Sequence, residues 1–210
     1  MGANHSDADE QLESALGTKE YWEERYKIEL ENYEDFRDEG EIWFGRSAEN
    51  RAIRYFLDAG LRKDSRIIDL GCGNGSMLRH LRRLKFSHLT GVDYCEDAIR
   101  LAKSIAEREA TNTDMPSINF QVVDLLEDNT LTDRYDIVMD KGTWDAMSLS
   151  SQKERRLSRY RGFYELREEL RKQFECKELC LETEIASTNS IMFGGKSGVT
   201  STGAIFRRVI

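Results

Sequence analysis

The residues of this chain whose types and spacing could bind a ligand begin at Asp69. This carboxylate stands at the end of a short apolar run, and Gly71, Gly73 and Gly75 follow at alternate positions before a helical pattern starts at Ser76. Glycine permits a positive φ and lets another group approach the backbone closely. A strand, a glycine turn and a helix N-terminus in this order form a ligand cradle at the carboxyl edge of an α/β sheet.

The spacing of this turn favours a ligand other than a pyrophosphate. The dinucleotide fingerprint is G-x-G-x-x-G, whereas the pattern from Asp69 to Gly75 lacks the last glycine of that fingerprint. An acidic residue just before the turn suits a ligand with a positive end. S-adenosylmethionine has an ammonium and a sulfonium group and no phosphate, so it meets this requirement. An ordinary strand-to-helix turn without a ligand is the alternative, because motif matches are hypotheses.

The elements that must position this turn follow the pattern of a doubly wound sheet. Ile67, Ile68 and Leu70 predict a strand that is buried on both faces. The patterns predict helices at residues 19–36, 47–57, 76–84 and 96–109 and strands at 66–70, 89–92, 118–123, 135–139, 178–185 and 203–210. Alternating strands and helices with short links are typical of an α/β fold.

Acidic residues stand at the ends of three further predicted strands. They are Asp93, Asp124 and Asp140. Ligands of open α/β sheets bind outside the carboxyl ends of the strands. Asp93 lies 22 positions after Gly71, which is about the separation at which the acid after the second strand meets a ribose hydroxyl pair. Asp93 or Asp124 could instead cap the following helix, but the joint arrangement favours a ligand site.

Two aromatic segments precede the glycine turn. Trp22, Tyr26, Leu30 and Tyr33 follow the spacing of an amphipathic helix that Thr18 can cap, and we expect this stripe to face the core. Residues 40–45, G-E-I-W-F-G, place two large aromatic side chains between glycines. They could seal the core, or they could form a wall of the ligand site, where an aromatic face attracts a cation.

Composition and charge restrict the class of protein. The chain has 210 residues, a net charge of −8 and no run of about 18 apolar residues, so we expect no membrane span. Its first residues lack the basic start and apolar core of a secretory signal. The four cysteines form no C-x-x-C pair, so no metal site is expected. Residues 1–19 and 20–41 carry net charges of −3 and −7, which suit a basic protein partner or a solvated helix face better than nucleic acid.

Four separated motifs together resemble one enzyme family. D-L-G-C-G-N-G at 69–75, G-V-D-Y at 91–94 and V-V-D-L at 122–125 resemble the cofactor motifs of class I S-adenosylmethionine-dependent methyltransferases. D-K-G-T-W-D-A at 140–146 is similar to a motif of eukaryotic methyltransferases that act on translation elongation factor 1-alpha. The segments at 40–45 and F-G-G-K-S-G at 193–198 resemble the elongation factor 1-alpha lysine methyltransferase 2 family.

This resemblance implies a role for each matched residue. Gly71 and Gly73 would let the backbone meet the methionine part of S-adenosylmethionine. Asp93 would accept hydrogen bonds from the ribose hydroxyls. Asp124 and Leu125 would flank the adenine, with the acid accepting from its amino group.

Further positions follow from the same motifs. Trp43 would help to close the pocket, and Asp140 would lie nearest the transferable methyl group, facing the incoming lysine as the catalytic residue. Asp69, Cys72 and Tyr94 are predicted to contact the cofactor. Elongation factor 1-alpha is the implied protein substrate, without a nucleic acid or membrane partner. We expect a monomer in the cytoplasm, with the nucleus left open, built from a disordered acidic tail at 1–18 and one methyltransferase domain at 19–210.

One departure from the family pattern concerns the sheet. The family sheet has seven strands, mostly parallel with an antiparallel C-terminal strand, but residues 150–177 contain no apolar run that could form the central strand after 135–139. We expect about twenty residues to be lacking near Arg161–Glu165 relative to the family, on the order of one strand and part of a helix. The chain could be a spliced or mis-joined form, or its sheet could close with the C-terminal strand beside 135–139.

An inactive isoform that binds cofactor or partner without turnover is therefore the alternative function. A nicotinamide oxidoreductase lacks its G-x-G-x-x-G here, and a nucleic-acid methyltransferase lacks its N-P-P-Y-type motif.

Overall fold

The computed structural model describes residues 14–110, 115–127, 131 and 133–160, together with the backbone of 179–193 and 196–208. The elements in chain order are η1 (Ala15–Gly17), α1 (Lys19–Phe36), α2 (Gly45–Asp58), β1 (Arg66–Leu70), α3 (Ser76–Arg83), β2 (His88–Asp93), α4 (Glu96–Ala110), β3 (Ile118–Val122), β4 (Ile137–Asp140), α5 (Thr143–Ser148), β5 (Leu179–Phe193) and β6 (Lys196–Arg208). Residues 153–160 are also helical. From α1 to β4 the predicted elements are confirmed, with boundaries shifted by two residues at most.

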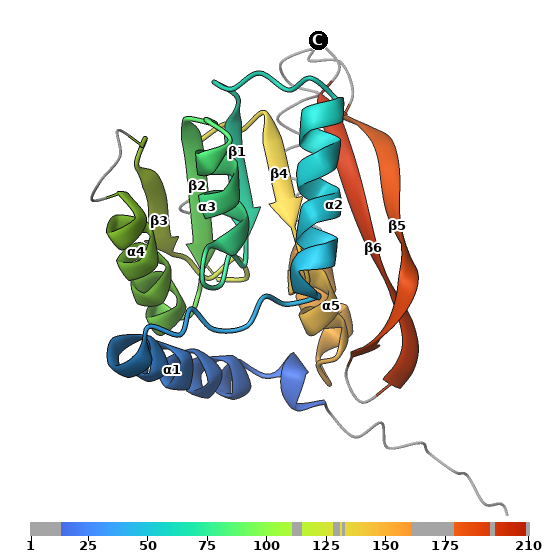
Figure 1. The fold of residues 1–210 in the computed structure, drawn as a ribbon. Coiled ribbons are helices and arrows are strands. Elements are labelled where there is room, and N and C mark those ends of the chain that lie inside the picture. The colour runs from blue at the N-terminus through green and yellow to red at the C-terminus, as the bar shows by residue number, and fades with distance from the viewer. Residues whose placement is uncertain are drawn as a thin grey trace, which may run out of the picture.

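The central sheet is parallel throughout and has the order β3-β2-β1-β4. In its register Leu70, the last residue of β1, pairs with Val92 of β2 and with Asp140 of β4. The carboxyl ends of these strands therefore meet at one edge, where α1 crosses below them in Figure 1. The α/β, Rossmann-like arrangement predicted from the sequence is confirmed, and it brings the acidic strand ends to the same edge.

Both faces of the sheet are covered. Because side chains alternate along a strand, Ile67 of β1 packs with Phe56 of α2 and Leu81 of α3, which lie in front of the sheet in Figure 1. Its neighbour Ile68 packs on the other face with Tyr160. Strand β1 is thus buried on both sides, as its continuous apolar run predicts.

Helix α1 forms a further layer against α4. Tyr26, Leu30 and Tyr33 are buried together with Leu101 of α4, so the predicted core-facing stripe is confirmed. The Thr18 hydroxyl oxygen accepts a hydrogen bond from the Tyr21 amide at 3.3 Å and caps the helix as expected.

Residues 14–18, predicted to end a disordered tail, instead belong to the folded domain. They form η1 and the cap of α1, and Gly17 packs directly against the backbone of Leu149 and Ser150. The Gly17 oxygen also accepts a hydrogen bond from Arg156 Nη1 at 2.7 Å. A contact between segments so far apart in the chain leaves no local sequence signal, which explains the error. Residues 1–13 of the predicted tail lie outside the described residues.

The last two strands pair with each other. Strands β5 and β6 form a separate antiparallel sheet, and β6 runs alongside β4 without pairing to it in the described structure (Figure 1). They are longer than the predicted strands at 178–185 and 203–210, because mutual pairing supplies partners for a polar segment with weak strand signals. Residues 141–160 contain no strand, and the expected gap near Arg161–Glu165 lies outside the described residues. In the part of the chain that is described, no helix is long and apolar enough to cross a membrane.

Candidate active site

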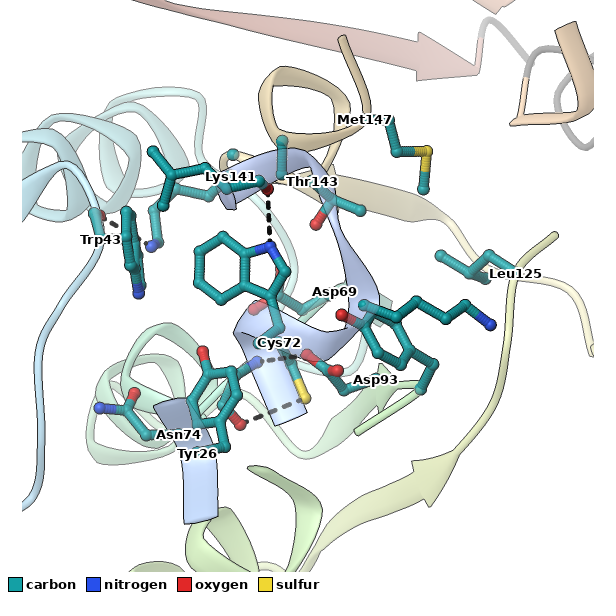
Figure 2. Close-up of a pocket in the computed structure, with 18 of the residues that line it drawn as sticks. Tyr26, Trp43, Asp69, Cys72, Asn74, Asp93, Leu125, Lys141, Thr143 and Met147 are labelled. Atoms are coloured by element: carbon teal, nitrogen blue, oxygen red, sulfur yellow. Dashed lines mark hydrogen bonds between the residues drawn. The ribbon is translucent and has the colours of Figure 1, made fainter. Parts of the chain in front are cut away.

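A cavity opens at the carboxyl edge of the parallel sheet, between the ends of its strands, α1 and the loop before α2 (Figure 2). Its lining contains every predicted site residue except Asp140. These residues are Trp43, Asp69, Gly71, Cys72, Gly73, Asp93, Tyr94, Asp124 and Leu125. Within the described residues no cluster of three or more His, Cys, Asp or Glu side chains could hold a metal ion.

The glycine turn makes room for two of the protein's own side chains. Gly71 has φ +72°, and a Cβ atom there would collide with the Thr143 hydroxyl oxygen. Gly73 has φ +53°, and a Cβ atom there would collide with the Tyr26 hydroxyl oxygen. Positive φ and the lack of space both require glycine at these positions. Thr143 and Tyr26 are thereby brought to the cavity from α5 and α1.

Asp93 links the glycine turn to the end of β2. Its Oδ2 accepts a hydrogen bond from the Gly73 amide at 3.1 Å (Figure 2), and its Oδ1 accepts one from the Cys95 amide at 3.0 Å. Burial raises the pKa of Asp93 to about 6, although backbone N–H donors oppose this shift. The capping role weighed from the sequence is therefore present. Each carboxylate oxygen keeps further acceptor capacity for a ligand in the cavity.

Asp69 and Lys141 form the charged floor of the cavity. The buried Asp69 carboxyl group has a pKa raised to about 7 by desolvation, and the positive charge of Lys141 opposes this rise. Lys141 Nζ donates a hydrogen bond to the Trp43 carbonyl oxygen at 3.0 Å, and burial lowers the pKa of this lysine. Glu49 of α2, only 2% exposed, adds a second negative charge beside this lysine.

An aromatic wall closes the cavity on the side of α1. The rings of Trp22 and Tyr26 stack at a centroid distance of 6.2 Å, and Trp22 meets Trp43 edge-on at 4.5 Å. Trp22 Nε1 donates a hydrogen bond to the Leu16 carbonyl oxygen at 2.8 Å, which holds η1 against this aromatic wall. Of the two interpretations weighed for the aromatic loop, the structure supports the wall, since Trp43 and Phe44 both line the cavity.

Asp124 and Leu125 lie at the opposite end of the cavity. The Asp124 Oδ1 atom accepts a hydrogen bond from the Leu126 amide at 2.9 Å, and Oδ2 forms an ion pair with Lys19. Lys19 Nζ also lies 5.2 Å from the centroid of the Tyr94 ring. The first residue of α1 is therefore a part of this site that the sequence analysis missed.

Asp140 lies beside the cavity and outside its lining. Its Oδ1 accepts a hydrogen bond from the Thr143 amide at 3.0 Å, while Oδ2 accepts from the Trp144 amide at 3.2 Å and from the Tyr160 hydroxyl at 2.6 Å. The carboxylate thus caps α5. Local N–H donors hold both oxygens at the N-terminus of this helix. The role predicted from the sequence, nearest the transferable methyl group and facing the incoming lysine, stays a prediction.

Several lining residues were missed from the sequence. The Asn74 side chain donates to the Glu39 and Glu41 carbonyl oxygens at 2.9 and 3.3 Å and accepts from the Ser76 amide at 3.2 Å, so it joins the glycine turn to the loop before α2. An asparagine just before a helix start is a recognisable cap signal. The cavity is also lined by Lys19, Trp22, Tyr26, Lys141, Thr143, Met147 and Arg156.

Comparison with known proteins assigns the chain to a family. A family model described as a methyltransferase domain matches residues 61–185. EEF1A lysine methyltransferase 2 of Danio rerio is 36% identical over 216 residues, which cover 93% of this chain and 88% of that protein. The Homo sapiens protein of the same name is 36% identical over 214 residues, with the same coverage. The chain belongs to the EEF1A lysine methyltransferase 2 family.

A further relative agrees with the EEF1A lysine methyltransferase 2 family, and a solved structure agrees with the fold. Protein-lysine N-methyltransferase EFM4 of Saccharomyces cerevisiae is 43% identical over 147 residues, which cover 67% of this chain and 63% of that protein. The structure of magnesium protoporphyrin IX methyltransferase from Synechocystis PCC 6803 with bound SAM aligns with a TM-score of 0.53 and 14% identity, over 87% of this chain and 97% of that chain. The family and the methyltransferase fold predicted from the motifs are thus confirmed.

Proposed function

We propose that this chain is an S-adenosylmethionine-dependent protein-lysine N-methyltransferase that acts on translation elongation factor 1-alpha. The names of relatives that share 36% identity over most of the chain support the reaction and the substrate. The observation that carries the proposal is the meeting of four separated motif segments in one cavity. They contribute Trp43, Gly71, Asp93 and Asp124 to its lining.

The residues of the cavity fit S-adenosylmethionine. The buried Asp69 carboxylate suits a positively charged amino-acid end, and the rings of Trp22, Tyr26 and Trp43 suit a sulfonium by cation–π attraction. Asp93 has acceptor capacity for ribose hydroxyls. When bound, this cofactor supplies an activated methyl group.

The remaining predicted positions take their roles from where they lie in the cavity. Gly71 and Gly73 expose backbone beside Asp69, and Cys72 lies between them. Leu125 offers an apolar surface to the adenine. We place Asp124 at this end together with Lys19, since the two form an ion pair there.

Tyr94 is proposed to contact the same end of the cofactor. Its hydroxyl group is buried and makes no hydrogen bond in the described structure. Buried polar groups in proteins are usually hydrogen-bonded, so this hydroxyl is available to a ligand. A cofactor hydroxyl or ring nitrogen at this end of the cavity would satisfy it.

The reaction needs a neutral amine at the end of the substrate lysine. A free lysine has a pKa of about 10.4, and a dry aromatic surrounding favours its neutral form by desolvation. Most of the rate then comes from positioning the amine. We assign Asp140 to this positioning through α5, because its oxygens are held by Thr143, Trp144 and Tyr160.

A form that binds cofactor or partner without turnover is the second candidate. The observation that favours it is the outer edge of β4, which pairs with no strand in the described part of the chain. An unpaired edge beside the cavity would weaken the support of the segment that starts at Asp140.

The proposal is tested by incubating the protein with elongation factor 1-alpha and labelled S-adenosylmethionine, followed by mass spectrometry of the lysines. Calorimetry with S-adenosylmethionine measures cofactor binding separately. Methylation of a lysine supports the enzyme. Cofactor binding without label on any lysine removes the proposed activity and favours the second candidate.

We also propose that the protein is a monomer of the cytoplasm, with the nucleus as a further compartment to examine, and that residues from Ser14 onward form its single domain. The acidic charge of the N-terminal part supports the absence of nucleic-acid binding. Size-exclusion chromatography with light scattering, imaging of the tagged protein and a nucleic-acid binding assay test these points.

A further inference from the structure

Tyr160 is joined to the first turn of α5 through a single carboxylate. The Tyr160 side chain is fully buried, and its hydroxyl donates a hydrogen bond to Asp140 Oδ2 at 2.6 Å. The same carboxylate accepts from the Thr143 and Trp144 amides. The ring of Trp144 packs 6.0 Å from that of Tyr160, centroid to centroid. A residue of the 153–160 helix is thereby joined to the start of α5.

Helix α5 forms part of the cavity wall. Thr143, Ala146 and Met147 all line the cavity. The Thr143 hydroxyl donates to the Leu70 carbonyl oxygen at 2.8 Å and fills the space beside Gly71. The position of α5 therefore determines how closely this wall approaches the glycine turn. Tyr160 itself does not line the cavity. Its ring packs with Val123 and Leu125, which do line it, and its hydroxyl acts on the site through Asp140 and α5.

The ionised form of Asp140 depends on the hydrogen bonds that this carboxylate accepts. Burial raises the pKa of Asp140, and the nearby Asp145 carboxylate acts in the same direction. The Tyr160 hydroxyl and the two α5 amides oppose this rise. Among the described residues, Lys141 and Asp69 also interact electrostatically with Asp140. A charged acceptor strengthens a hydrogen bond. Loss of the Tyr160 hydroxyl would therefore weaken the hold of Asp140 on the first turn of α5.

We propose that Tyr160 is a positioning residue for methyl transfer, which holds the Asp140 carboxylate in place as the cap of α5 and so holds the Thr143 and Met147 wall against the cavity. The proposal rests on the proposed methyltransferase function for its kinetic consequences. Its structural consequences, the order of α5 and its response to pH, do not depend on that function.

The test compares Tyr160→Phe with Tyr33→Phe. Both tyrosines are buried with a hydroxyl that donates a hydrogen bond, but that of Tyr33 reaches the Ser104 carbonyl oxygen at 3.5 Å, between α1 and α4. For Tyr160→Phe we expect kcat to fall about tenfold while KM for S-adenosylmethionine stays within about twofold, as for a lost hydrogen bond to a charged group. The acid limb of the kcat profile should move to higher pH, because Asp140 loses a donor that favours its ionised form. Tyr33→Phe should leave the profile unchanged.

Hydrogen exchange provides a readout that needs no activity. The amides of Thr143 and Trp144 should exchange faster in Tyr160→Phe than in the wild type or Tyr33→Phe, with the difference largest at low pH. If the wild type methylates no substrate, the proposed function fails while this measurement still decides the role of Tyr160. Unchanged amide exchange in the folded Tyr160→Phe protein would overturn the proposal.

A second variant separates this role from general packing. In an Asp140→Asn background the Tyr160→Phe change should add little further effect on amide exchange, because the charged acceptor is already gone. This holds even if Tyr160→Phe alone lowers stability. Fully additive effects of the two changes would mean that Tyr160 does not act through Asp140, and would equally overturn the proposal.

Discussion

Lys141 Nζ donates a hydrogen bond to the main-chain oxygen of Trp43 at 3.0 Å, which joins the residue after β4 to the loop before α2. The two residues come from separate motifs, and both line the cavity. The same ammonium group balances the buried Asp69 carboxylate. Lys141 thus fixes the position of the Trp43 loop and opposes the rise in the pKa of Asp69. Neither effect requires contact with the substrate.

Replacement of this lysine should weaken cofactor binding. In Lys141→Met the loop at Trp43 loses a fixed contact, and the pKa of Asp69 rises further because the opposing positive charge is gone. We expect the Kd for S-adenosylmethionine at pH 7.5 to rise about tenfold, as for loss of one charged hydrogen bond. Calorimetry measures this. Lys103→Met, on the exposed face of α4, is the matched control. Equal affinities for the two variants would contradict this role.

Substitution at two glycines can distinguish the cost of backbone strain from the cost of a steric clash. Gly71 and Gly45 have nearly the same φ, +72° and +73°, but a Cβ at Gly71 meets Thr143 whereas one at Gly45 has no atom within 4 Å. Gly45→Ala should lower the free energy of unfolding by about 1 kcal/mol through strain alone. Gly71→Ala should cost about 2 kcal/mol more, because α5 must also shift. Urea unfolding measures both, and a cost at Gly71 no larger than at Gly45 would show that Thr143 yields freely.

The ion pair of Lys19 with Asp124 should slow the release of cofactor. It connects the start of α1 to the segment after β3 across the cavity rim, with side chains that are 38% and 18% exposed. Lys19→Met and Asp124→Asn should each speed the dissociation of S-adenosylhomocysteine about two- to fivefold, as expected for a partly exposed pair. Stopped-flow tryptophan fluorescence can follow this, since Trp22 and Trp43 line the cavity. The double variant should resemble either single variant, and multiplied effects would mean that the two residues act independently.

Stability and cofactor binding should respond to pH in opposite directions. Burial raises the pKa of Asp69 to about 7 and that of Asp93 to about 6, above the ordinary value of about 3.9. Between about pH 4 and 7 the folded cofactor-free protein therefore binds more protons than the unfolded chain, so these groups make its free energy of unfolding fall as pH rises. Cofactor binding should strengthen over the upper part of this range, because the ionised acids suit its positive end and its hydroxyls.

Thermal unfolding with and without S-adenosylmethionine, measured from about pH 5.5 to 8, checks both directions. The increase in Tm that the cofactor causes should grow with pH. In Asp69→Asn part of this growth should disappear. A cofactor-induced increase that is constant across the range would show that neither acid needs to ionise for binding.

The parts of this fold that could be predicted are those with a local physical cause. The apolar run before Asp69, the glycines that allow positive φ and the cap at Thr18 each act within a few residues, so α1 and β1 were predicted with their observed bounds. Asp93 was placed in the site because parallel strands end at a common edge. Its dual contact with Gly73 and Cys95 needed the structure, since both contacts depend on how two loops meet.

Other features could not be predicted because their causes are distant in the chain. Lys19 and Asp124 are 105 positions apart, and nothing in either local segment indicates the pairing. The hydrogen bonds of Asp140 could not be predicted for a different reason. The sequence D-K-G-T can be interpreted as a helix cap as well as a catalytic motif, and the amide donors of Thr143 and Trp144 became visible only in the structure. The pairing of β5 with β6 likewise depends on which neighbours are available, which strand propensity does not encode.

The contact of Gly17 with Arg156 has a practical consequence for where the protein can be cut. A shortened protein that begins at Lys19 would keep all of α1 but lose the main-chain oxygens that hold Arg156 and the Trp22 indole. Two of its cavity walls would then be free to move, although every motif residue would still be present. The smallest fragment that preserves the cavity therefore begins upstream of every recognisable methyltransferase motif.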